Sequence, residues 1–227
     1  MRQRLDNARR TWLSPLFRET RRMVERPRPR HWLWAGAAAV VIAALATAVG
    51  LVWQRQEPAT QASPDDAYAS APACGALASD TVESVVPRAL LETNEHGLLA
   101  GSDSATCEWT SVDSAQAPAR VLHVDYEAHF TDKAGGVSGA DAAREELARL
   151  TSTTGIDRSE PVPSVGPEAV VWSSTPGAGS AEVAFRRDNL VVRVFYSGEE
   201  ADGGDALSYG EARDGVSSVA DRIASAL

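Results

Sequence analysis

The longest apolar stretch of the chain runs from Trp32 to Trp53 and contains no charged residue. At a rise of 1.5 Å per residue, a helix of that length spans roughly 33 Å, which is enough to cross the hydrocarbon core of a bilayer. Trp32 and Trp34 stand at one end and Trp53 at the other, and indole rings favour the headgroup layer. The pattern therefore predicts a single transmembrane helix with these three tryptophans at the membrane interfaces.

The flanking charges predict the orientation of this helix. Residues 1–31 hold ten arginines against three acidic residues, whereas the whole chain has a formal net charge of −9. Arginine beside a span stays in the cytoplasm, so we expect a cytoplasmic N-terminus and an extracellular C-terminal domain at the cell membrane. A signal peptide cleaved in the Ala-rich end of the run (Ala46, Ala48) is the alternative.

The basic arm and the span also suggest membrane contacts. Ser14 and Pro15 open a predicted amphipathic helix rich in arginine, which is typical of a segment lying on the anionic inner leaflet. The alternative is that the arginines only hold the N-terminus in the cytoplasm. No nucleic-acid motif accompanies the charge, so no nucleic-acid partner is expected. Small residues four apart in the span would permit weak homodimerisation.

After the span, residues 54–73 are rich in Pro, Ala, Ser and Gln, and we expect them to form a disordered linker. Residues 74–227 form one predicted domain, in which a loop holds Asn94, Gly97 and Gly101. Alternating apolar and polar residues predict strands, and periodic apolar residues with capping signals predict helices. Predicted strands cover 106–112, 121–130, 168–174, 182–187 and 190–197, and predicted helices cover 80–86, 138–150 and 209–226.

The expected fold is therefore α+β: a mainly antiparallel sheet of about five strands, packed with helices as a sandwich. The two cysteines, Cys74 and Cys107, both lie in the predicted outer domain. An even count in an oxidising compartment favours a disulfide between them.

Four short motifs resemble an actinobacterial envelope domain of unknown function, found in lipoproteins and similar to the extracytoplasmic sensor domains of receptor kinases. They are Cys74–Leu77, Cys107–Trp109, Val165–Ala169 and Arg186–Val192. The resemblance implies an α+β sandwich with a Cys74–Cys107 bridge and a ligand-binding or envelope role. This chain differs from those families in having a true span, no lipobox and no kinase domain, and no functional residue is carried over.

Candidate chemistry is sparse. His123, Asp125, Glu127 and His129 alternate along one predicted strand, so they share a face. They are weak candidates for a metal or pH-responsive site, because residues about 6.6–6.8 Å apart cannot all bind one ion. A solvated face, or one packed beneath a helix with paired charges, is the alternative.

The acidic loop with Glu199, Glu200, Asp202 and Asp205 could supply oxygen ligands to calcium, but its residues do not fit the spacing of an EF-hand. We therefore expect a solvated turn. No catalytic or nucleotide-binding motif is present, so we expect neither enzyme activity nor a cofactor. Aromatic residues on the predicted strands would form the core or line a ligand pocket: Trp109, Trp172, Phe185, Phe195 and Tyr196.

Two functional hypotheses remain. The first is a membrane-anchored extracytoplasmic binding or sensor-like domain of the cell envelope, which predicts a concave apolar pocket. The second is a structural or assembly factor for an envelope complex, which predicts an exposed apolar patch. An envelope hydrolase is a distant third.

Overall fold

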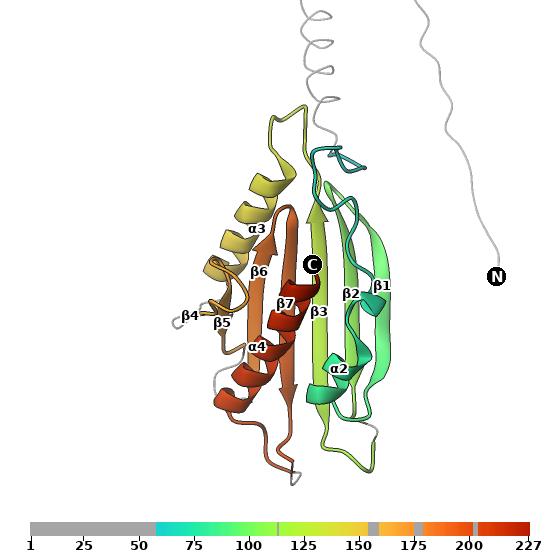
Figure 1. Cartoon of the computed structure of the whole chain (residues 1–227), viewed down its shortest axis with the longest axis vertical. Helices are drawn as coiled ribbons and strands as arrows, with labels where there is room; N and C mark the ends of the chain where they lie inside the picture. The colour runs from blue at the N-terminus through green and yellow to red at the C-terminus, as the bar shows by residue number, and fades with distance from the viewer. Residues whose placement is uncertain (1–57, 113, 154–158, 175–178, 202–203) are drawn as a thin grey trace, which may run out of the picture. The chain divides into compact units, whose positions relative to one another are not determined.

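The computed structural model describes residues 58–112, 114–153, 159–174, 179–201 and 204–227. They form an α+β fold with a seven-stranded antiparallel sheet (Figure 1). Within these ranges, no helix is both long and apolar enough to cross a membrane. The predicted basic arm and the predicted span with Trp32, Trp34 and Trp53 lie outside the described residues.

The sheet has the strand order β1-β2-β3-β7-β6-β5-β4, and every neighbouring pair is antiparallel. The strands are β1 (Leu90–Leu99), β2 (Ser102–Thr110), β3 (Arg120–His129), β4 (Glu160–Pro161), β5 (Val170–Trp172), β6 (Ser180–Arg187) and β7 (Leu190–Gly198). The helices are the 3-10 turn η1 (Cys74–Ala76), α2 (Ser79–Val85), α3 (Gly139–Thr153) and α4 (Tyr209–Ala226).

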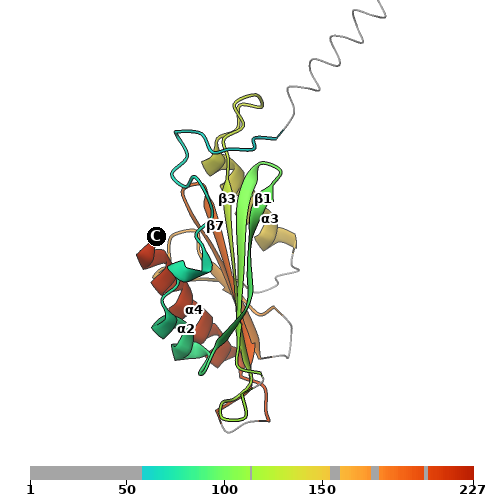
Figure 2. The ribbon, with the colours of Figure 1, turned by 90° about the vertical axis from the view of Figure 1, so that its right-hand side faces the viewer.

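The predicted alternation along β3 is confirmed, and it divides the sheet into two faces. Leu122, Val124, Tyr126 and Ala128 are buried on one face, where α2 and α4 pack (Figure 2). We call this the α4 face. Helix α4 begins at a capping box made by Ser208 and Glu211, and its buried side chains complete the main core. The predicted boundaries of α4 are confirmed.

Helix α3 covers part of the opposite face, which we call the α3 face (Figure 2). Its predicted start is confirmed, because the Ser138 hydroxyl accepts a hydrogen bond from the Asp141 N–H at 3.1 Å. Leu147 on the helix packs with Trp172 and Ala184 from the sheet in a small second core. The helices therefore cover both faces of the sheet.

The prediction of about five strands is wrong, because the sheet contains seven. Residues predicted as a loop around Asn94 and Gly97 form β1, which pairs with β2 along its whole length. Gly101 makes the turn between them with a φ of +88°. Strand β1 lies at the sheet edge and is exposed on both faces, so it lacks the alternation of buried and polar residues that identifies a strand. Strand β4, also missed, has only two residues.

Residues 58–73, predicted to belong to a disordered linker, are instead held against the domain. Asp66 accepts hydrogen bonds from the backbone N–H and the hydroxyl of Thr131 at 3.0 and 2.6 Å. The N–H of Ala71, which is buried, donates to the Asp103 carboxylate at 3.0 Å. The segment has few apolar side chains but attaches through hydrogen bonds, which its composition does not reveal. The packed domain therefore begins before the predicted boundary at Cys74.

Asn189 holds the segment at Tyr68 through two hydrogen bonds, so we expect Asn189→Ala to release it. The Asn189 amide accepts from the N–H of Tyr68 at 2.8 Å and donates to the carbonyl oxygens of Tyr68 and His129 at 2.9 and 2.8 Å. Alanine leaves these partly buried backbone groups without their partner, which costs about 2 kcal/mol of unfolding free energy. Limited proteolysis should then cut residues 58–73 faster.

Asp188→Asn is the control for this experiment. Asp188 is exposed and has a φ of +52°, a conformation that asparagine adopts readily. Equal proteolysis rates for the two variants would show that Asn189 does not hold the segment.

Candidate functional site

The four metal candidates of β3 lie together on the α3 face, as their alternation predicts, but they pair with neighbouring side chains. His123 places Nδ1 3.2 Å from Glu108 and Nε2 3.0 Å from Asp125. The hydrogen bond to Asp125 is the main reason that the pKa of His123 lies above its usual value, although burial works against it. Burial tends to raise the pKa of Asp125, but hydrogen bonds from His123 and Thr106 outweigh it and lower that pKa.

The other two candidates sit further along the strand. Glu127 accepts a hydrogen bond from the Ser102 hydroxyl at 2.8 Å, and His129 Nε2 lies 3.7 Å from the same carboxylate. Across the part of the chain that the structure describes, no group of three or more His, Cys, Asp or Glu residues is arranged to hold a metal ion. The polar face of β3 is thus held by pairs within the strand and by hydrogen bonds to side chains of β2.

A shallow groove lies between α3 and this polar face, with a volume of about 280 Å³. Its charged lining includes Arg193, which pairs with the buried Glu182, and Arg149, which pairs with Glu146. The pairing with Glu182 is the main reason that the pKa of Arg193 lies above its usual value. A charged ligand would have to compete with these internal partners, so the groove is a poor site for one.

The acidic loop carries no further chemistry in the described residues. Glu199 and Ala206 form an isolated antiparallel β-bridge, and the N–H of Glu200 donates to the carbonyl of Asp205 at 2.8 Å. These backbone bonds close the loop into a turn after β7. Asp202 lies outside the described residues.

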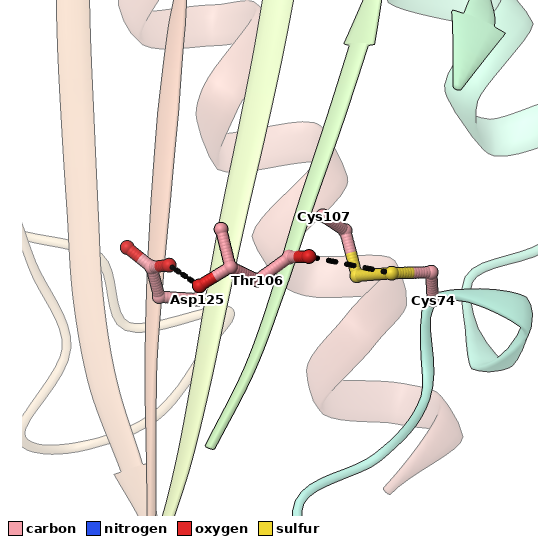
Figure 3. The surroundings of a disulfide bond; sticks show 4 residues. All are labelled: Cys74, Thr106, Cys107 and Asp125. Carbon is pink, nitrogen blue, oxygen red and sulfur yellow. Dashed lines mark hydrogen bonds between the residues drawn. A yellow bond between two sulfur atoms is a disulfide. The ribbon is translucent and has the colours of Figure 1, made fainter. Parts of the chain in front are cut away.

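The predicted disulfide between Cys74 and Cys107 is confirmed, with a Cα–Cα distance of 5.6 Å. It fixes η1 over the α4 face, and Cys74 Sγ lies 3.7 Å from the carbonyl oxygen of Thr106. Figure 3 shows the adjacent Thr106 side chain turning the other way to donate to Asp125, at 2.7 Å. Neighbouring residues of β2 thus serve opposite faces of the sheet.

Beside the disulfide lies an apolar pocket of about 230 Å³, which we call the Trp109 pocket. Trp109 and Leu91 of β1 both line it; Trp109 is buried, whereas Leu91 is 46% exposed. The full lining is Cys74, Gly75, Leu77, Ser79, Val82, Glu83, Ala89, Leu91 and Trp109. Of the aromatic residues considered in the sequence, Trp172, Phe185 and Tyr196 are core, whereas Trp109 is both buried and part of a pocket.

Strand β1 is the most exposed apolar feature of the described residues. It is the outermost strand on one side of the sheet (Figure 1). Two leucines stand at each of its ends: Leu90 and Leu91 are 62% and 46% exposed, and Leu98 and Leu99 are 65% and 53% exposed. The two Leu-Leu pairs are visible in the sequence, but only the sheet shows that they lie on one open edge.

Comparisons of the chain with protein-family models, with curated proteins and with solved structures gave no match.

Proposed function

We propose that this chain is a single-pass membrane protein, with a cytoplasmic N-terminus, whose extracytoplasmic domain binds a protein partner along the edge strand β1. The uncharged run at 32–53 and the arginines before it support the membrane topology. The Cys74–Cys107 disulfide supports an oxidising compartment for the domain.

The open edge at β1 carries this proposal. A long, apolar edge strand presents unpaired backbone N–H and C=O groups and invites the addition of another strand. The opposite edge of the sheet is protected, because β4 has only two residues and one of them is Pro161. Strand β1 is ten residues long and has no proline. It carries Glu92, Glu95 and a bulge near Leu91, but leucines occupy four of its positions and leave both of its ends apolar. A partner strand would satisfy the backbone and bury the leucines.

The Trp109 pocket fits the same mode of binding. In recognition by strand addition, backbone hydrogen bonds supply affinity and pockets for alternate side chains supply specificity. Leu91 belongs both to β1 and to the pocket wall, so the two features form one surface. At about 230 Å³ the pocket is smaller than the roughly 300–1,000 Å³ of small-molecule sites. An apolar side chain of a partner is therefore a better occupant than a separate ligand.

This function belongs to the assembly hypothesis, without enzyme activity, and it is favoured over a small-ligand sensor. Exposed apolar surface marks protein contact. The charged groove beneath α3, by contrast, has its charges paired within the domain.

Hydrogen exchange of the full-length protein in its native membrane tests the proposal. We expect β1 amides that point away from β2 to exchange about tenfold more slowly in the wild type than in Leu98→Asp, because a partner strand protects them. Leu98 is 65% exposed, so its replacement leaves the domain fold intact. The control is Val137→Asp, an exposed position outside β1. Fast exchange of these amides in the wild type would refute the proposal.

A further inference from the structure

The spacing of residues along β1 bears on which partner occupies this edge, and this inference rests on the function proposed above. The strand reads LLETNEHGLL, with a Leu-Leu pair at each end. Its ladder with β2 is irregular: Leu91 pairs with Trp109, and Thr93 pairs with the next residue, Glu108. Glu92 is therefore an extra residue in a β-bulge, without a partner of its own.

The bulge makes the strand symmetrical. Counted along the ladder, Leu91 lies three paired positions before Glu95, and Leu98 lies three positions after it. Leu90 and Leu99 likewise lie four positions to either side. Without the bulge, the midpoint of β1 would fall between two residues. Leu90 and Leu99 would then lie on opposite faces of the sheet, so they could not lie opposite each other on the same face in a pair of β1 strands.

The leucines that would lie opposite each other also project from the same face of the sheet. Antiparallel strands related by a twofold axis perpendicular to the sheet place residues from the same face opposite each other. Leu91 and Leu98 both lie on the α4 face, since they pair with Trp109 and Asp103. Leu90 and Leu99 both lie on the α3 face, opposite Thr110 and Ser102.

We propose that β1 pairs antiparallel with β1 of a second copy of this chain, about a twofold axis at Glu95. In this register Leu91 lies opposite Leu98 of the second copy, beside the Trp109 pocket, and Leu90 lies opposite Leu99. Thr93 lies opposite Gly97, and Asn94 lies opposite His96. The two seven-stranded sheets become one continuous sheet across the dimer.

The centre of this contact limits its strength. Glu95 faces Glu95 of the second copy, and like charges directly opposite each other weaken a strand pair. One pair of strands also buries less surface than a stable interface requires. Confinement of both copies in one membrane raises their effective concentration, so we expect the dimer to form there. Glu95→Gln removes the repulsion and should raise the dimer fraction.

Cysteine cross-linking of the full-length protein in membranes tests the register. The wild-type chain has only Cys74 and Cys107, which are bonded to each other, so an introduced cysteine is the only free thiol. Opposite residues in an antiparallel pair have Cα atoms about 4.5–5.5 Å apart, within disulfide range. We expect Glu95→Cys to form a disulfide-linked dimer under mild oxidation.

Thr93→Cys and Gly97→Cys are the matched variants. In the proposed register, Thr93 of one copy lies four positions along the strands, about 13 Å, from Thr93 of the other copy. Gly97 of one copy lies equally far from Gly97 of the other. Neither variant should cross-link alone, whereas the two coexpressed in one membrane should cross-link to each other. A Cβ at Gly97 meets no atom within 4 Å, so the cysteine fits there.

Failure of Glu95→Cys to cross-link, or equal cross-linking of Thr93→Cys alone and in the mixture, would overturn the dimer. Slow exchange of the outward β1 amides together with failed cross-linking would mean that a different protein occupies the edge, so only this inference would fail. Fast exchange of those amides would refute both the inference and the proposed function.

Discussion

Replacing both Cys74 and Cys107 with serine is expected to lower the free energy of unfolding by about 3–4 kcal/mol. The disulfide joins residues 33 positions apart, and closing a loop of this length restricts the unfolded chain. Both cysteines are also buried in the main core, where η1 meets the sheet. The loss should therefore loosen η1 and open the Trp109 pocket as well as lower global stability.

Urea unfolding of the full-length protein in a mild detergent measures this effect. The wild type in the presence of a reductant should unfold at the same urea concentration as the double serine variant. The reductant should not change the urea concentration at which the double serine variant unfolds, so this measurement controls for other effects of the reductant. If the variant and the oxidised wild type unfold together, the disulfide does not stabilise the domain.

Trp172→Ala should cost about 3–5 kcal/mol, the usual cost of removing a buried tryptophan side chain. Trp172 is only 2% exposed and forms the second core with Leu147 of α3 and Ala184 of β6. This core attaches α3 to its face of the sheet. We therefore expect α3 to lose protection from hydrogen exchange before the main core does.

Trp172→Phe is the matched control, because it keeps an aromatic ring in the cluster and should cost less than the alanine variant. Urea unfolding and the exchange of α3 amides measure the two variants. Unchanged protection of α3 in Trp172→Ala would show that other contacts hold the helix to the sheet.

The regular elements of the domain were predictable wherever one side was buried and the other exposed. Strand β3 alternates because its two faces meet different surroundings, and α4 shows a periodic apolar face because it packs on the sheet. The helix predicted over 80–86 is α2, which begins at Ser79. The structure places the N-cap at Ala78, which makes no side-chain hydrogen bond.

The candidate sites were predicted less well. The sequence placed His123, Asp125, Glu127 and His129 on one face of one strand, which is correct. It could not show that a carboxylate and two hydroxyls of β2 and an arginine of β7 lie beside them, because strand order is set by long-range pairing. The same limit hid the Trp109 pocket, since its walls come from η1, α2, β1 and β2.

The sequence by itself determined the disulfide partners, the α+β class and the faces of β3 and α4. The span and its orientation remain predictions from the sequence, because they lie outside the described residues. These follow from composition and from local periodicity, which act over a few turns or a few alternating residues. Only the tertiary structure decided that residues 90–99 form an edge strand and that residues 58–73 pack on the domain. Both depend on backbone hydrogen bonds to distant partners, β2 for the first and Asn189, Asp103 and Thr131 for the second. Such bonds leave no periodic pattern in the side chains.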